Sequence, residues 1–129
     1  MEYYFSTSLH CSFDEAIART IEALKVEGFG VITEINMQAK LKEKLGVDFK
    51  KYVILGACNP AFAYKALQIE DKIGTMLPCN IIVTEKEEGI IEVSAVNPIA
   101  SMMAIQNSLL EPLALEITTK IKRVINLLK

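Results

Sequence analysis

Apolar and polar residues alternate at the start of the chain. From Tyr3 to Leu9, odd and even positions fall on opposite faces of an extended chain, which is the period of a half-buried strand. Ser12 and Glu15 then have the spacing of a capping box, in which the Ser12 hydroxyl accepts a hydrogen bond from the Glu15 amide. The next residues predict an amphipathic helix ending near Gly28, because apolar-face positions recur every three or four residues, at Phe13, Ala16, Ile17, Thr20, Ile21 and Leu24.

Three further segments have the pattern of regular structure. Residues 29–36 are rich in β-branched side chains, which favours a strand. Residues 37–45 carry apolar side chains at one-turn intervals and predict a short helix. Residues 52–57 form a continuous apolar run, which is typical of a central strand covered on both faces.

The second half of the chain begins with a helix signal and continues with a hairpin. Asn59 and Pro60 supply an N-cap and a first-turn proline for a helix that reaches about residue 69. Residues 80–85 and 90–96 read as two strands, and the polar loop between them contains a glycine suited to positive φ. These two strands are expected to pair antiparallel.

The last part of the chain is predicted to be helical. Asn97 and Pro98 stop the preceding strand and can cap a short helical turn. From about Ser108 the chain reads as one long helix with Pro112 in its first turn, and its apolar stripe comprises Leu113, Ile117, Ile121, Val124 or Ile125, and Leu128. The whole succession predicts an α+β fold, in which one sheet carries the two principal helices on one face and short helical insertions join the strands.

Composition agrees with a single globular domain over residues 1–129. Of the 129 residues, 51% are hydrophobic and 23% are charged, which is enough apolar material for one core, and no linker or repeat interrupts the chain. Lysine and arginine total 14 against 16 acidic residues, which gives a formal net charge of −2. This charge offers no excess of positive groups for a phosphate backbone, so we expect no nucleic-acid partner.

The compartment is inferred from apolar runs and cysteines. No apolar run approaches the roughly 18 residues that a membrane span needs, and the start of the chain has no basic segment followed by an apolar stretch. The three cysteines are an odd number in a chain that can build a core without cross-links. We therefore expect a cytoplasmic protein with free thiols and no membrane partner. Glycine-rich phosphate-binding motifs do not occur, and we expect no cofactor.

Three short segments occur in a distinctive order. They are residues 54–60 (ILGACNP), 77–83 (LPCNIIV) and 93–98 (VSAVNP). Their order and spacing resemble the signature of the domain-of-unknown-function 302 family, and the two principal helices extend the resemblance over essentially the whole chain. One departure is Asn97, where an aspartate is usual in the family.

The resemblance implies a fold similar to the TATA-binding-protein-like arrangement, with a β-α-β-β-β-β-α core, helical insertions and often a homodimer. It implies no DNA binding, because function belongs to sites and not to folds. It also implies no particular reaction, substrate or ligand.

Cys58 is the first candidate for chemistry. It directly precedes Asn59 and Pro60, and the free amides and dipole of a helix N-terminus favour a thiolate. It also follows an apolar strand, and cysteine is often a small buried core residue. Cys58 is therefore either a reactive thiol or part of the core.

A second Cys-Asn pair, Cys79-Asn80, follows Pro78 at the start of another predicted strand. If both pairs lie at one edge of the sheet, their thiols and amides could converge on a small ligand. Alternatively, Asn59 and Asn80 only cap and turn the backbone. The predicted ligand-binding set is Cys58, Asn59, Pro60, Pro78, Cys79 and Asn80.

A metal site would have to draw on His10 and Cys11 together with Cys58 and Cys79. Zinc accepts three thiolates and one imidazole. The chain has no pair of ligands at the two- or three-residue separations typical of zinc sites, so the four residues would have to come from distant segments.

Two other clusters have ordinary structural interpretations. The lysines between residues 40 and 51 could attract an anionic partner or form a solvated surface; they are Lys40, Lys42, Lys44, Lys50 and Lys51. Met102 and Met103 could form a dimer contact, line an adaptable pocket or belong to the core.

These observations leave three hypotheses about function. The first is a non-enzymatic homodimeric binding or interaction domain, with a small molecule as a possible ligand and no catalytic residue. The second is a thiol-based redox or sulfur-transfer protein that uses Cys58 with Cys79. The third is metal binding through Cys58, Cys79, Cys11 and His10.

Overall fold

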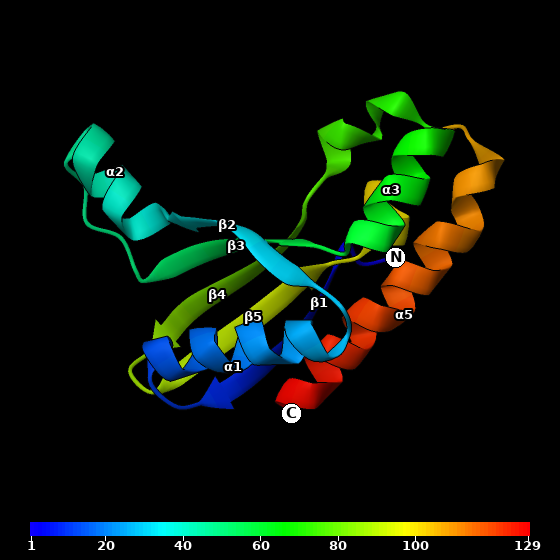
Figure 1. Ribbon diagram of the computed structural model, residues 1–129. Helices are drawn as coiled ribbons and strands as arrows, with labels where there is room; N and C mark the ends of the chain where they lie inside the picture. Colours follow the sequence, from blue (N-terminus) through cyan, green and yellow to red (C-terminus); the bar gives the residue numbers. More distant parts are fainter.

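The computed structural model describes all residues from 1 to 129. Its framework is one five-stranded antiparallel sheet with the strand order β1-β5-β4-β3-β2 (Figure 1). The strands are β1 (Tyr4–His10), β2 (Gly30–Asn36), β3 (Tyr52–Cys58), β4 (Cys79–Glu87) and β5 (Ile90–Val96).

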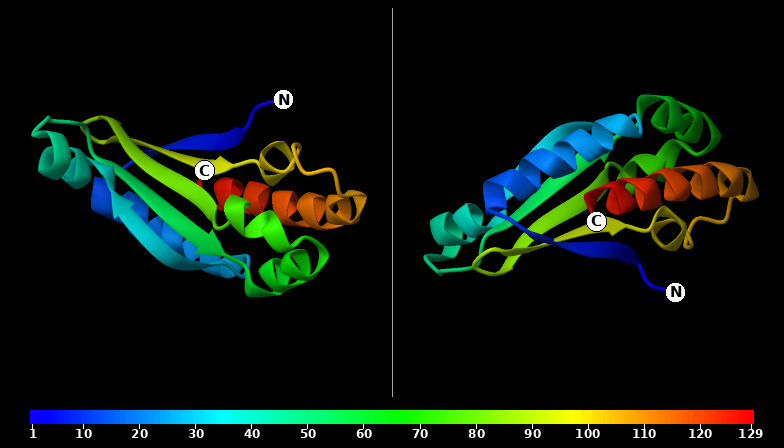
Figure 2. Two further views of the ribbon diagram at one scale, coloured as in Figure 1. Left: turned by 90° about the horizontal axis from the view of Figure 1, so that it is seen from above. Right: turned by 90° about the horizontal axis from the view of Figure 1, so that it is seen from below.

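Two long helices cover one face of this sheet. Figure 2 shows α1 and α5 on the same side, and the two helices also contact each other. The predicted α+β class, with the principal helices on one face, is therefore confirmed. No helix is both long and apolar enough to cross a membrane. The helices are α1 (Phe13–Val26), α2 (Met37–Leu45), α3 (Pro60–Ile69), α4 (Pro98–Ser101) and α5 (Glu111–Leu128), with short 3-10 segments η1 (Asp71–Met76) and η2 (Ser108–Leu110).

Local sequence signals set the helix ends. The Ser12 hydroxyl accepts a hydrogen bond from the Glu15 amide at 3.1 Å, which satisfies one of the free donors at the start of α1. Asn59 does the same for the amide of Phe62 at 3.2 Å, at the start of α3. Gly28 follows α1 with a φ of +84°, a conformation that a side chain would disfavour.

The hydrophobic core lies between the helices and the covered face of the sheet. Alternation along β3, β4 and β5 directs every second side chain into this layer. The sheet residues that are fully or almost fully buried there are Val53, Leu55, Ala57, Ile81, Val83, Ile91, Val93 and Ala95. From the other side α5 contributes Ile117, Ile121, Val124, Ile125 and Leu128, and α1 contributes Phe13, Ala16, Ala23 and Leu24.

The opposite face of the sheet carries no helix, and we call it the uncovered face (Figure 2). The prediction that residues 52–57 are covered on both sides is wrong within one copy of the chain, because Tyr52 and Ile54 point to this face and are only half-buried. Strand alternation and register place the following residues on the uncovered face: Tyr4, Ser6 and Ser8 of β1, Thr33 and Ile35 of β2, Tyr52, Ile54 and Gly56 of β3, Asn80, Ile82 and Thr84 of β4, and Glu92, Ser94 and Val96 of β5.

An arm extends from the end of the sheet. It consists of β2, α2 and the loop to β3, and Figure 1 shows α2 standing away from the other helices. No residue of α2 is buried, and Leu45, Val47 and Phe49 near its end are exposed. Asn36 accepts a hydrogen bond from the Ala39 amide and Gly46 adopts positive φ, so local caps define this helix.

Candidate functional site

The two Cys-Asn pairs lie at the same end of neighbouring strands. Cys58 is the last residue of β3 and Cys79 the first of β4, and Ala57 lies opposite Cys79 in the antiparallel register. The two Cys-Asn pairs therefore lie at the same end of the sheet, as a shared ligand site would require. The role of the six residues in ligand binding stays a prediction.

The two thiols at this edge have different surroundings. Cys79 shares the covered face with Ala57 and is only 6% exposed. Burial, with a smaller contribution from the charge of nearby Cys58, raises the pKa of the Cys79 thiol from 9.0 to about 11. Cys58 is half-buried, and strand alternation places it on the opposite face from Ala57. Cys79 is consequently a neutral buried thiol at neutral pH, which gives no support to a thiolate pair.

The two asparagines do not converge. Asn59 caps α3, while Asn80 is exposed on the uncovered face opposite Gly56. Pro60 occupies the first turn of α3, and the ring of Pro78 lies against Gly56, where an added Cβ would meet its Cγ at 2.7 Å. Asn59 and Pro60 thus form the start of α3, and Pro78 packs against the sheet.

The four residues considered for a metal do not form one cluster. His10 pairs with Ile90 at the hairpin end of the sheet, whereas β1 begins at Tyr4 opposite Val96, near the end that holds Cys79. Six strand steps separate these ends, a distance of roughly 20 Å. No group of three or more His, Cys, Asp or Glu side chains in the structure could hold a metal ion, and all three cysteines are free.

The lysine cluster is a solvated surface. Lys40 pairs with Glu43 at 3.5 Å and Lys42 with Asp48 at 3.1 Å, and all four side chains are exposed. Lys50 and Lys51 lie in the exposed loop before β3. Exposed pairs of this kind contribute little to stability or binding.

A shallow groove marks the uncovered face. Its volume is about 400 Å³, and Tyr3, Tyr4, Tyr52, Ile82 and Val96 form much of its wall. Sequence reasoning missed this groove. The available signal was the apolar run over residues 52–57, which is too apolar for a strand with one face in water.

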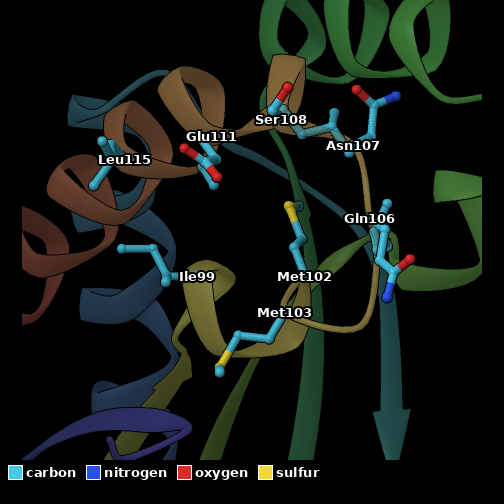
Figure 3. Close-up of a pocket in the computed structure, with 11 residues that line it drawn as sticks. Ile99, Met102, Met103, Gln106, Asn107, Ser108, Glu111 and Leu115 are labelled. Atoms are coloured by element: carbon cyan, nitrogen blue, oxygen red, sulfur yellow. The ribbon is translucent and has the colours of Figure 1, made fainter.

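A larger half-open pocket lies between α4 and the start of α5. Its volume is about 660 Å³, and Figure 3 shows Met102 and Met103 among the residues that line it. Met102 is buried and Met103 is exposed. Met102 belongs to the hydrophobic core and also lines this pocket, while Met103 lines the pocket only, so two of the three interpretations of this methionine pair apply. A dimer contact through these methionines stays a prediction. Sequence reasoning did not identify Glu111 or Leu115, which also line the pocket.

Asn97 is buried and uses both ends of its amide. Its Oδ1 accepts a hydrogen bond from the Ile99 amide at 3.1 Å, and its Nδ2 donates to the carbonyl of Glu2 at 3.0 Å. A carboxylate could keep the first bond and not the second, since it has no donor. Asn97 therefore joins the start of the chain to α4.

The chain is similar to one family of known proteins. A comparison with curated proteins finds no match. Among solved structures, an uncharacterized conserved protein DUF302 from Bacillus stearothermophilus is similar over 100% of both chains, with 28% sequence identity and a TM-score of 0.91. Residues 5–128 match the sequence profile of the family described as Domain of unknown function DUF302. The chain therefore belongs to the DUF302 family, whose function is unknown.

Proposed function

We propose that this protein is a non-enzymatic homodimer that acts as a binding or interaction domain, and that its two copies associate through the uncovered face. The observation that carries this proposal is the sequence of β3. Residues 52–57 have the continuous apolar pattern of a strand covered on both faces, while one copy of the chain covers only one. A second copy supplies the missing layer.

The chemistry of the uncovered face favours a second copy of the same chain. Its centre carries Tyr52, Ile54 and Ile82, and tyrosine is enriched at protein interfaces because an apolar ring ends in a hydrogen-bonding group. The one carboxylate on this face, Glu92, is paired with Lys86 at 3.4 Å. Two copies can therefore approach without strong charge repulsion.

The size of the face is sufficient for a specific contact. Strand spacing and rise give a face of about 24 Å by 23 Å for five strands of about seven residues, on the order of 500 Å² per copy. The total for two copies is on the order of 1,000 Å², about the area that a proposed biological interface should clear. The exposed apolar side chains of the arm can enlarge this area.

Binding is supported over catalysis by the positions of the nucleophiles. A catalytic thiol needs a thiolate beside a base. The pKa of Cys79 is raised to about 11, and His10, the single histidine, lies at the other end of the sheet from both Cys58 and Cys79.

Multi-angle light scattering with size-exclusion chromatography tests the proposal. We expect a dimer for the native protein and a monomer with an unchanged far-ultraviolet spectrum for Ile82→Lys, because the contact would have to bury an unpaired ammonium group at its apolar centre. Leu127→Lys is the matched control, since Leu127 is an exposed residue of α5 on the other side of the molecule. A native monomer, or a dimer that Ile82→Lys leaves intact, would contradict the proposal.

A further inference from the structure

The pocket between α4 and α5 has the dimensions of a small-molecule site. Its volume of about 660 Å³ lies within the range of roughly 300 to 1,000 Å³ that is usual for ligand pockets. Seven of its eleven lining residues are hydrophobic. In Figure 3, Ile99 and Leu115 lie on one side of the cavity and Gln106 and Asn107 on the other, with Met102 between them.

The apolar wall is adaptable and partly exposed to water. Met103 is 68% exposed and Leu115 is 59% exposed, although both line a concave surface. Unbranched methionine side chains adjust to ligands of different shape. An apolar ligand that covered these side chains would remove their surface from water, which is the main source of favourable free energy for such sites.

The polar groups of the pocket specify the charge of the ligand. Asn107 is occupied within the protein, because its Nδ2 donates to the carbonyl of Ile69 at 3.3 Å and its Oδ1 accepts from the Leu109 amide at 3.1 Å. Glu111 is the one charged residue in the wall, and its carboxylate takes part in no ion pair. The wall therefore presents a free carboxylate beside an apolar surface.

We infer that this pocket binds an amphipathic organic amine. The apolar body of the ligand lies against Ile99, Met102 and Leu115, and its ammonium group lies at the Glu111 carboxylate. An anionic amphiphile of the same length would meet a like charge there. This site shares no residue with the groove on the uncovered face, so it is independent of the dimer contact.

Three probes with the same chain length and different head groups test the inference: n-octylamine, n-octanol and n-octanoate. Each is titrated into the protein while the NMR shifts of residues 99–115 are followed. We expect saturable binding with the amine tightest and the carboxylate weakest. Glu111→Gln should weaken amine binding roughly five-fold, the effect of losing one partly exposed ion pair, and leave octanol binding unchanged.

A matched pair of leucine variants tests the apolar wall. Leu115→Ser should weaken binding of both octylamine and octanol, whereas Leu127→Ser should weaken neither, because Leu127 is similarly exposed at 51% on the same helix but lies outside the pocket. Three results would overturn the inference: no saturable binding of any probe, tighter binding of octanoate than of octylamine, or equal binding by native protein and Leu115→Ser.

Discussion

The two faces of the sheet differ in apolar content and in what covers them. On the covered face, Leu55, Ile81 and Val83 are completely buried under α1 and α5. On the uncovered face, their immediate neighbours Ile54 and Ile82 are only half-buried. The helices of one copy therefore cover the more apolar face and leave Ile54 and Ile82 partly in contact with water. The proposed second copy would cover these two side chains.

The largest effect should come from shortening a side chain on the covered face. Leu55→Ala removes a fully buried side chain between the sheet and its helices, and we expect it to lower the free energy of unfolding by about 3 kcal/mol. Ile54→Ala, one residue earlier on the uncovered face, should cost about 1 kcal/mol in the monomeric Ile82→Lys background. Urea denaturation of both variants in that background measures the difference. Equal losses would remove the distinction between the faces.

Alkaline pH should lower the free energy of unfolding through the buried Cys79 thiol. Its thiol is protonated in both states below pH 9; between pH 9 and about 11 only the unfolded chain releases the proton, so stability falls as pH rises. Over that window the loss should approach about 2.7 kcal/mol. Urea denaturation across this pH range should show a smaller decline for Cys79→Ala than for native protein. Parallel curves would mean that this thiol is not desolvated.

Gly56 should prove the least tolerant position on the uncovered face. A Cβ there would collide with the Thr33 hydroxyl and lie 2.7 Å from Cγ of Pro78, so Gly56→Ala should cost about 2 kcal/mol. At Gly30, on the neighbouring strand, an added Cβ meets nothing within 4 Å. Thermal unfolding of Gly30→Ala is the control and should show little change. A tolerated Gly56→Ala would mean that the β2 side of this face is loosely packed.

The smallest effect should be a gain in stability from the helix layer above the covered face. The Thr118 hydroxyl is buried and has no hydrogen-bond partner, so Thr118→Val should stabilise the protein by about 1 kcal/mol. Thr20 is equally inaccessible, but its hydroxyl donates to the carbonyl of Ala16 at 2.7 Å. Calorimetry should therefore show no comparable gain for Thr20→Val. A destabilised Thr118→Val would indicate that this hydroxyl has a partner in solution.

Much of the fold was predictable because its signals are local. Ser12 and Asn59 mark helix starts through hydrogen bonds within one turn, and Pro112 lies in the first turn of α5. Gly89 adopts the positive φ expected in the hairpin. The 3-10 segment η1 was not predicted, since residues 71–76 have no helical apolar period.

The candidate sites were less predictable because they depend on register and packing. Sequence placed Cys58 and Cys79 at two strand ends, but only the pairing of Ala57 with Cys79 shows that strand alternation separates the thiols onto different faces. The pocket next to Met102 forms because α4 and the start of α5 meet, and no periodicity along the chain describes that meeting.

Adjacent isoleucines provide the most direct measurement of the proposed dimer contact. A soluble paramagnetic gadolinium chelate broadens the δ1-methyl signals of isoleucines that water reaches, and Ile81 and exposed Ile32 are internal references for protected and accessible methyls. We expect that at high protein concentration the Ile82 methyl is protected like that of Ile81, and that it becomes more accessible on dilution as the dimer dissociates. Broadening of Ile82 that is strong at every concentration would contradict a second copy on the uncovered face.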